Sequence, residues 1–462
     1  MKPFTPYETK TIGLIPDAIR GYVMDVGLIT ILLLGMVFFL FVLGFPISFT
    51  LATTGALFAA VFLGPRALYM VATSMYGGIT SLTLMAIPLF IFMGTLLSFT
   101  GIADDMFKAI YMWAGGIGGA LAMGAVAISA IFAAMCGESG AATVTMGTIA
   151  LPAMLEHKYD KNIAVGSVGA GALLGIMIPP SVLAIIYASV AGMSVGRLYL
   201  GMMIPGVLLS VLYILYIYIR CLFQPHIGPK IPKEERPSMR EKLIALKGMS
   251  LPIFILFLVL GGMYTGTATP TEAAGVGAAG VMLSGLLKGS LNYKVIKNSL
   301  LDALKLSSMI MWLIMSITLF SQVYSAIGAA ELIQEIVKRL PVQGMFVIVM
   351  MQLSIFIMGM FMDDVAIILL VTPLYLPIVR MLGFSDLWFA VMFMVQVNIA
   401  WLTPPYGFNL FYMRAVTPPS VTMGDIYKSV FPFIGLQLIV LLLVMFVPEV
   451  SMWLPTLLLG GE

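Results

Sequence analysis

Charged residues are scarce in this sequence. Only 10% of the 462 residues are Asp, Glu, Lys or Arg, whereas about a quarter of a soluble domain is charged. The mean hydropathy is +1.06, and 61% of the residues are hydrophobic. This composition excludes an ordinary soluble domain and indicates an integral membrane protein. The net charge of +3 is small, which argues against a nucleic-acid partner.

Cysteine and histidine are also rare, with two of each. Cys136 and Cys221 lie in or beside apolar segments, so we interpret them as small buried hydrophobes. His157 and His226 lie in polar segments, which leaves little material for a metal centre or a nucleophile with its base. An intramembrane enzyme is therefore a remote alternative, and we expect neither enzymatic activity nor an organic cofactor.

Long polar segments are missing, while apolar stretches near the roughly 20 residues needed to cross a bilayer recur along the chain. The first 24 residues lack a small-residue cleavage site, so we expect a lead-in segment rather than a removable signal peptide. The segment 329–340 is amphipathic, with Leu332, Ile336 and Leu340 on one helical face. The predicted spans are 26–44, 46–64, 84–100, 198–223, 250–268, 270–287, 304–327 and 430–447.

Four further segments combine apolar runs with Gly, Pro and polar residues, and none can be a plain membrane helix. Residues 118–154 predict a hairpin with a loop at 136–140, and residues 162–191 predict a span broken at 175–180. Residues 343–380 and 387–413 predict a second hairpin and a second broken span. Because proline lacks the amide donor and frees a carbonyl one turn earlier, the breaks leave backbone oxygens available. Irregular backbone at membrane depth is stable only where protein buries it or where it lines a cavity and binds something there.

The two halves of the sequence repeat each other at an offset of 225 residues. Pro179 and Pro404 are related by this offset, as are Pro152 and Pro377. Glu138 falls on Asp363 at the same offset. Such paired, broken segments are typical of secondary transporters built from inverted repeats.

An odd number of crossings in each half would invert the second half relative to the first. If the basic segment 224–249 is cytoplasmic, the N-terminus lies outside and sixteen of the 24 Lys and Arg residues lie inside, as the positive-inside rule favours. We therefore predict an all-α polytopic protein with two re-entrant hairpins. The expected parts are a lead-in (1–24), a first repeat (25–223), a cytoplasmic linker (224–249), a second repeat (250–450) and a tail (451–462).

Backbone carbonyls and hydroxyls at the breaks are hard oxygen ligands suited to a small cation, and the broken helix ends add partial charges of both signs. We predict a sodium site in each half. The first comprises Gly137, Ser139, Thr143, Gly175, Ile178 and Pro179. The second comprises Asp363, Asp364, Ala366, Ala400, Thr403 and Gly407. The alternative is that Gly and Pro here only permit close packing and kinks.

Polar residues near the breaks are candidates for binding an anionic substrate. They are Glu138, Ser139, Ser181, Gln396, Asn398, Asn409 and Arg414. The carboxylates at the hairpin tips are costly in a membrane unless functional, although a tip facing water would solvate them. The three amide side chains could instead bridge helices, and Arg414 could instead set topology or contact headgroups.

Several of these motifs resemble one family, the DctM-like large membrane subunits of tripartite ATP-independent periplasmic (TRAP) transporters. The motifs are GFPISFTLATTG (44–55), CGESGAATVTMGTIALPAM (136–154), GIMIPPS (175–181), YTGTATPTEAAGVG (264–277), GMFMDDVAIILLVTPLYLPI (359–378) and LTPPYGFNLF (402–411). The resemblance implies inverted repeats, a mobile elevator domain and sodium-driven import of a small organic anion, a carboxylate or a sulfonate. It also implies a bacterial or archaeal inner-membrane protein that works with a small four-helix membrane subunit and a periplasmic substrate-binding protein, in contact with membrane lipid.

The sequence also departs from the pattern of that family. Glu138 stands where the family often has Ser, Ala142 where it has Asp or Thr, and Gln396 where it has Asn. Our hypothesis is sodium-coupled uptake of an organic anion, with sodium holding the hairpins in a binding-competent shape. The alternative within transport is a stand-alone sodium or proton symporter of related fold that needs no binding protein.

Overall fold

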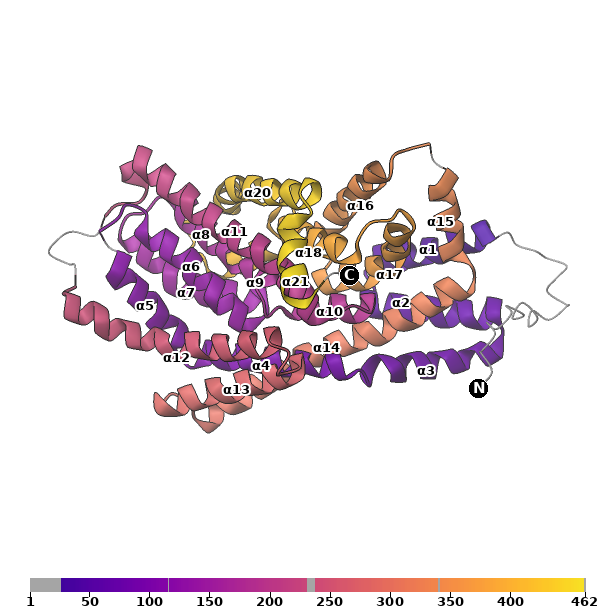
Figure 1. Cartoon of the computed structure of the whole chain (residues 1–462), viewed down its shortest axis with the longest axis horizontal. Coiled ribbons are helices and arrows are strands. Elements are labelled where there is room, and N and C mark those ends of the chain that lie inside the picture. Colours follow the sequence, from indigo (N-terminus) through magenta and orange to yellow (C-terminus); the bar gives the residue numbers. More distant parts are fainter. Residues whose placement is uncertain (1–25, 115, 231–236, 340, 461–462) are drawn as a thin grey trace. The chain divides into compact units, whose positions relative to one another are not determined.

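The computed structural model describes residues 26–114, 116–230, 237–339 and 341–460, and these form helices and short connections without a strand (Figure 1). Six described helices are long and apolar enough to cross a membrane, or seven if the pair Thr83–Phe99 and Ile102–Trp113, bent by 62°, counts as one span. The chain is thus an all-α polytopic protein, as predicted. The lead-in 1–24 and Leu340 lie outside the described residues.

The helices pack into two compact units. The first unit takes Met1–Ser81 and Ile310–Pro341, and the second takes Leu82–Met309 and Val342–Glu462. Each unit draws on both halves of the sequence, because packing joins elements that the repeat separates.

The first unit is held by contacts between early helices and the end of a long late helix. The rings of Phe49 and Trp312 lie 5.6 Å apart, and Ser74 donates a hydrogen bond of 2.5 Å to Gln322. Its elements are α1 (Val26–Val42), α2 (Ile47–Phe58), the π-helical turn η1 (Ala59–Leu63), η2 (Pro65–Ala67), α3 (Leu68–Ile79), the end of α14 (Tyr293–Ala326) and α15 (Ala329–Arg339).

The second unit contains both hairpins and both broken spans. Its first elements are η3 (Leu82–Met85), α4 (Ala86–Phe99), α5 (Ile102–Ala114), α6 (Ala120–Cys136), α7 (Ser139–Glu156), α8 (Lys161–Ala172), α9 (Leu174–Met177), α10 (Val182–Ala191), α11 (Val195–Phe223), η4 (Pro225–Ile227), α12 (Met239–Tyr264) and α13 (Pro270–Leu287). Its later elements are α16 (Gly344–Gly359), α17 (Asp364–Met381), α18 (Asp386–Leu402), α19 (Phe408–Val416), α20 (Met423–Phe446) and α21 (Glu449–Leu459).

The centre of the second unit is made by the broken helices. Every residue of α8 from Ile163 to Ala172 is buried, and so is every residue of α18 from Leu387 to Leu402. Protein therefore covers both helices on all sides: α8 packs against α6, α7 and α20, and α18 packs against α16, α17 and α20. By contrast, α12 lies at the edge beside α5, as Figure 1 shows, and only 17% of its most apolar window is buried.

Helix bounds recur at the offset found in the sequence. The helix α7 spans 139–156 and α17 spans 364–381, while α8 with α9 spans 161–177 and α18 spans 386–402. The starts of α3 and α14, Leu68 and Tyr293, differ by the same 225 residues. The inversion of one half relative to the other stays a prediction.

Some helices were not predicted from the sequence. The helices α3, α5 and α21 were missed, and α12 begins at Met239, inside the segment predicted as a linker loop. The helix α5 carries Asp104, Asp105 and Lys108, and such charges lower the hydropathy of any window that includes them. The helices α3 and α21, of 12 and 11 residues, are shorter than the window of about 19 residues used to find spans.

Candidate functional site

The tip of the first hairpin is two residues long, Gly137 and Glu138. Gly137 has φ +65°, a left-handed conformation that favours glycine. The carboxylate of Glu138 accepts hydrogen bonds from the amides of Gly140, at 2.6 Å, and Ala141, at 2.8 Å. Glu138 thus caps the N-terminus of α7, where the unpaired amides of the first turn attract negative charge.

The first hairpin tip touches the first break, which runs from Ile178 to Ser181. The amide of Val182 donates to the carbonyl of Gly137 at 3.0 Å. A Cβ atom on Gly137 would lie 3.1 Å from Val182 Cγ2 and 3.5 Å from the carbonyl oxygen of Pro180. The structure therefore brings together the hairpin tip and the break that the sequence placed opposite each other.

A buried tyrosine holds the backbone of the first break. The hydroxyl of Tyr199 donates to the carbonyl of Ser181 at 3.0 Å and accepts from its amide at 3.2 Å. The Ser181 hydroxyl in turn accepts from Ala184 and caps α10. Sequence reasoning missed Tyr199, although a tyrosine inside an apolar span usually has a polar partner for its hydroxyl.

The second break, between α18 and α19, brings two backbone carbonyl oxygens close to Gly407. Gly407 has φ +32°, and a Cβ atom there would lie 2.9 Å from the carbonyl oxygens of both Trp401 and Thr403. The Thr403 hydroxyl donates to the carbonyl of Ile399 at 2.7 Å. Two backbone oxygens therefore face one small space beside Gly407, and of these the sequence named only that of Thr403.

The tip of the second hairpin carries two carboxylates before α17. Asp364 is buried and accepts a hydrogen bond from Val365 at 2.7 Å. Oδ2 of Asp363 is buried and has no hydrogen-bond partner in the part of the chain that the structure describes. Each hairpin tip thus carries a carboxylate, Glu138 in the first and Asp363 with Asp364 in the second.

The predicted substrate residues on α18 and α19 bridge helices. Asn409 donates to the carbonyl of Gly169 at 2.8 Å and accepts from Thr143 at 2.5 Å. Asn398 donates to the carbonyl of Leu173 at 3.0 Å and accepts from Gln437 at 2.7 Å. Both amides are fully buried and use both ends of the side chain. The structure thus shows the bridging alternative, and substrate contact by these two residues stays a prediction.

The remaining predicted residues divide between the core and the surface. Gln396, Gly175, Ala366 and Ala400 are buried in the second unit. Arg414 is partly buried and donates to the carbonyl of Val421 at 2.5 Å, which ties the end of α19 to the loop that follows. Ser139 starts α7 and its carbonyl accepts from Thr143 at 2.9 Å. Within the described ranges, no group of three His, Cys, Asp or Glu side chains is placed to hold a metal ion.

A family model described as "Tripartite ATP-independent periplasmic transporter, DctM component" matches residues 34–450. One similar protein is the C4-dicarboxylate TRAP transporter large permease protein DctM of Vibrio cholerae, 30% identical over 461 residues that cover 95% of this chain and 99% of the relative. The sialic acid TRAP transporter large permease protein SiaM of the same species is 27% identical, over 90% of this chain and 96% of the relative.

Two further similarities concern subunit arrangement and fold. The isethionate TRAP transporter permease protein DctMQ of Oleidesulfovibrio alaskensis is 29% identical over 89% of this chain and 64% of its own length. The crystal structure of the Alcanivorax borkumensis YdaH transporter superposes with a TM-score of 0.67, at 12% identity, over 92% of this chain and 99% of that one. At this identity the structural likeness shows the fold alone.

Proposed function

The chain belongs to the family of DctM components of tripartite ATP-independent periplasmic transporters, and from this premise we propose that it imports a small organic anion by sodium-coupled alternating access. Within this family the chain is a large permease subunit, and the chain itself is a multi-pass membrane protein. The observation that carries the proposal is the contact between the first hairpin tip and the first break, inside one packed unit that also contains the second hairpin and the second break. Oxygen ligands of both halves thereby lie within one packed unit.

Sodium is the coupling ion that these oxygens favour. At the second break, the carbonyls of Trp401 and Thr403 face one space, and small hard cations prefer such oxygen ligands. A cation at the tip of the second hairpin offsets the negative charge of the buried carboxylates there, and Oδ2 of Asp363 has no other partner within the described residues. We propose a further sodium site at the first hairpin tip and the first break, with the ligands predicted there from the sequence.

The substrate is an organic anion, a carboxylate or a sulfonate. The relatives are named for C4-dicarboxylate, sialic acid and isethionate, which are all anions. Broken helix ends supply amide groups and positive partial charge for such a ligand. We place the substrate near the hairpin tips, delivered by a periplasmic binding protein, with a small four-helix membrane subunit beside this chain in the inner membrane.

The test is uptake by the chain reconstituted in vesicles with its small subunit and its binding protein. We expect uptake of labelled anion to need an inward sodium gradient and to stop when potassium replaces sodium. Undiminished uptake in potassium would contradict the sodium coupling. Omission of the binding protein separates the alternative, because a stand-alone symporter would keep its full rate without it.

The elevator movement is tested separately from the ion coupling. If the second unit carries the site across the membrane, a cysteine placed at exposed Tyr406 next to the second break should be labelled by a membrane-impermeant reagent from one side with sodium and from the other side without it. A labelling side that never changes would contradict the movement and leave the sodium experiment unaffected.

A further inference from the structure

A groove of about 430 Å³ lies between α5 and α12, and none of its lining residues belongs to a hairpin or a break. Its lining is part charged and part apolar. The lining residues are Asp105, Lys108, Met112, Glu241, Ile244, Ala245 and Gly248.

The two helices that form the groove are joined at both ends. At one end, the indole nitrogen of Trp113 donates to the carbonyl of Lys242 at 2.9 Å. At the other end, a Cβ atom on Gly248 would lie 3.0 Å from Asp105 Cβ, so α5 and α12 touch there. The helices run antiparallel between these contacts, and the groove is therefore a built feature of their packing.

The place of the groove along α12 fits the level of lipid headgroups. Its residues on α12 occupy the first turns of a candidate span, Met239–Tyr264, and precede the apolar stretch that begins at Met249. Trp113, whose side chain is half exposed, sits beside them, and tryptophan is enriched at membrane–water interfaces. Only 17% of the most apolar window of α12 is buried within this chain, so the rest of that window is open to lipid.

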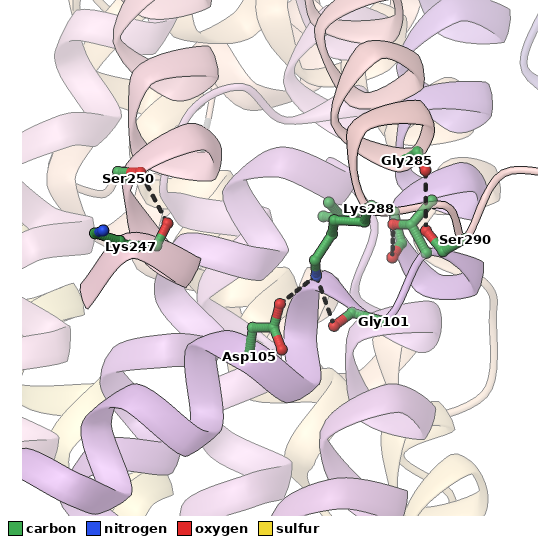
Figure 2. A network of polar contacts seen from close by, with 9 residues as sticks. Gly101, Asp105, Lys247, Ser250, Gly285, Lys288 and Ser290 are labelled. Atoms are coloured by element: carbon green, nitrogen blue, oxygen red, sulfur yellow. Dashed lines mark hydrogen bonds and ion pairs between the residues drawn. The ribbon is translucent and has the colours of Figure 1, made fainter. Parts of the chain in front are cut away.

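One charge in the lining is already neutralised inside the protein. Asp105 forms an ion pair with Lys288 of α13, and the Lys288 ammonium also donates to the carbonyl of Gly101 at 3.3 Å (Figure 2). Figure 2 also shows Lys247 and Ser250 on the neighbouring turns of α12. The groove is thus left with one cation, Lys108, and one anion, Glu241, to act on a ligand.

These two charges are available from the described part of the chain. Lys108 is exposed and forms no ion pair within the described ranges. Oε2 of Glu241 accepts from the amide and hydroxyl of Ser238, at 2.7 and 2.8 Å, in a capping box, while Oε1 keeps its acceptor capacity. A ligand with one negative and one positive group, carried on an apolar chain, matches this lining.

We propose that this groove binds the headgroup of a phosphatidylethanolamine lipid. The phosphate lies on Lys108, the ammonium lies on Glu241, and the acyl chains follow Met112, Ile244 and the exposed apolar face of α12. An anionic lipid such as phosphatidylglycerol offers no cation to Glu241 and is repelled by it. Phosphatidylcholine carries a quaternary ammonium that cannot donate a hydrogen bond to a carboxylate.

The first experiment uses the unmodified chain, so it does not depend on the folding of a variant. The purified protein is placed in nanodiscs with equal parts of phosphatidylethanolamine, phosphatidylglycerol and phosphatidylcholine, and the lipids that stay bound on release are counted by native mass spectrometry. We expect phosphatidylethanolamine to be enriched several-fold over the other two. Equal retention of the three lipids, or preference for phosphatidylglycerol, would overturn the proposal.

The second experiment assigns the binding to these two side chains. In the double variant Lys108→Ala and Glu241→Gln we expect the enrichment to be lost, so that the three lipids are retained about equally. The matched control is Lys305→Ala and Asp302→Asn, which removes the same charges from an exposed pair on α14 and should keep the enrichment. The variant Glu241→Lys should change the preference to phosphatidylglycerol. Equal loss in the control, or unchanged selectivity in Glu241→Lys, would contradict the assignment.

Discussion

At Glu138, the effect of capping α7 and the effect of the negative charge can be measured separately. Its carboxylate caps α7, and serine is also a good cap. We expect Glu138→Ser to keep the melting temperature close to the parent, because the cap survives. The sodium concentration for half-maximal uptake should rise about tenfold, since one of three carboxylates at the hairpin tips is lost, a change of roughly 1.4 kcal/mol.

The readouts for Glu138→Ser are thermal unfolding in detergent and sodium-dependent uptake in vesicles. Glu138→Gln keeps the size of the side chain and removes only its charge, so it should show the same shift in sodium dependence. A fall in stability with unchanged sodium dependence would mean that Glu138 serves only as a cap.

Tyr199 is the second residue with a definite expectation. Its hydroxyl makes two hydrogen bonds to the backbone of Ser181, and all of these groups are buried. Tyr199→Phe leaves the Ser181 amide without this partner, which should cost about 1–3 kcal/mol of stability. We expect lower thermal stability and slower uptake. Tyr218→Phe on the same helix, at an exposed position, is the control and should change neither.

At the scale of elements, the bridge between α7 and α19 couples the two halves. Thr143 and Asn409 are hydrogen-bonded at 2.5 Å in the core. A double-mutant cycle with Thr143→Val and Asn409→Leu should therefore give an interaction free energy of about 0.5–3 kcal/mol in unfolding experiments. The pair Thr143→Val and Gln437→Leu shares no hydrogen bond and should be additive within experimental error. Additivity in the first pair would show that the bridge contributes nothing.

The elements show what sequence reasoning could and could not reach. The hairpins and breaks were predictable because Gly137, Pro179 and Pro404 interrupt apolar runs, and such interruptions are local signals. The helix α5 was not, since its charges hide it from a hydropathy window. Tyr199 and Ser181 lie 18 residues apart in the sequence. No pattern in either segment predicts that the Tyr199 hydroxyl will form hydrogen bonds with the Ser181 backbone. Partners across packed helices depend on the tertiary fold.

The same distinction applies to the bridging amides. Asn398 and Asn409 were recognisable as polar residues beside the second break, which the structure bears out. Their carbonyl partners, Leu173 and Gly169, are on another broken helix. An apolar residue and a glycine give no sign in sequence that their backbone oxygens need a donor, so the sequence left bridging and substrate binding as open alternatives.

At the scale of the whole molecule, one contact bears on the symmetry of the two halves. Asn398 donates to the carbonyl of Leu173, and these positions are 225 residues apart, the offset of the repeat. A residue that touches its own counterpart lies close to any two-fold axis that relates the halves. The contact therefore supports a two-fold relation, and the orientation of that axis decides whether the repeat is inverted or parallel.

Paired positions decide between the two orientations. Tyr69 and Lys294 are exposed, lie in the first turns of α3 and α14, and are related by the offset of 225. In a background with Cys136→Ala and Cys221→Ala, we expect a membrane-impermeant maleimide to label Tyr69→Cys in intact cells. Lys294→Cys and Arg240→Cys should be labelled only after the membrane is opened, because the central basic segment is predicted to be cytoplasmic. Labelling of Tyr69→Cys and Lys294→Cys from the same side would show a parallel repeat. Both hairpins would then open toward the same compartment. Two such hairpins could not give access to the site from the two sides of the membrane in turn.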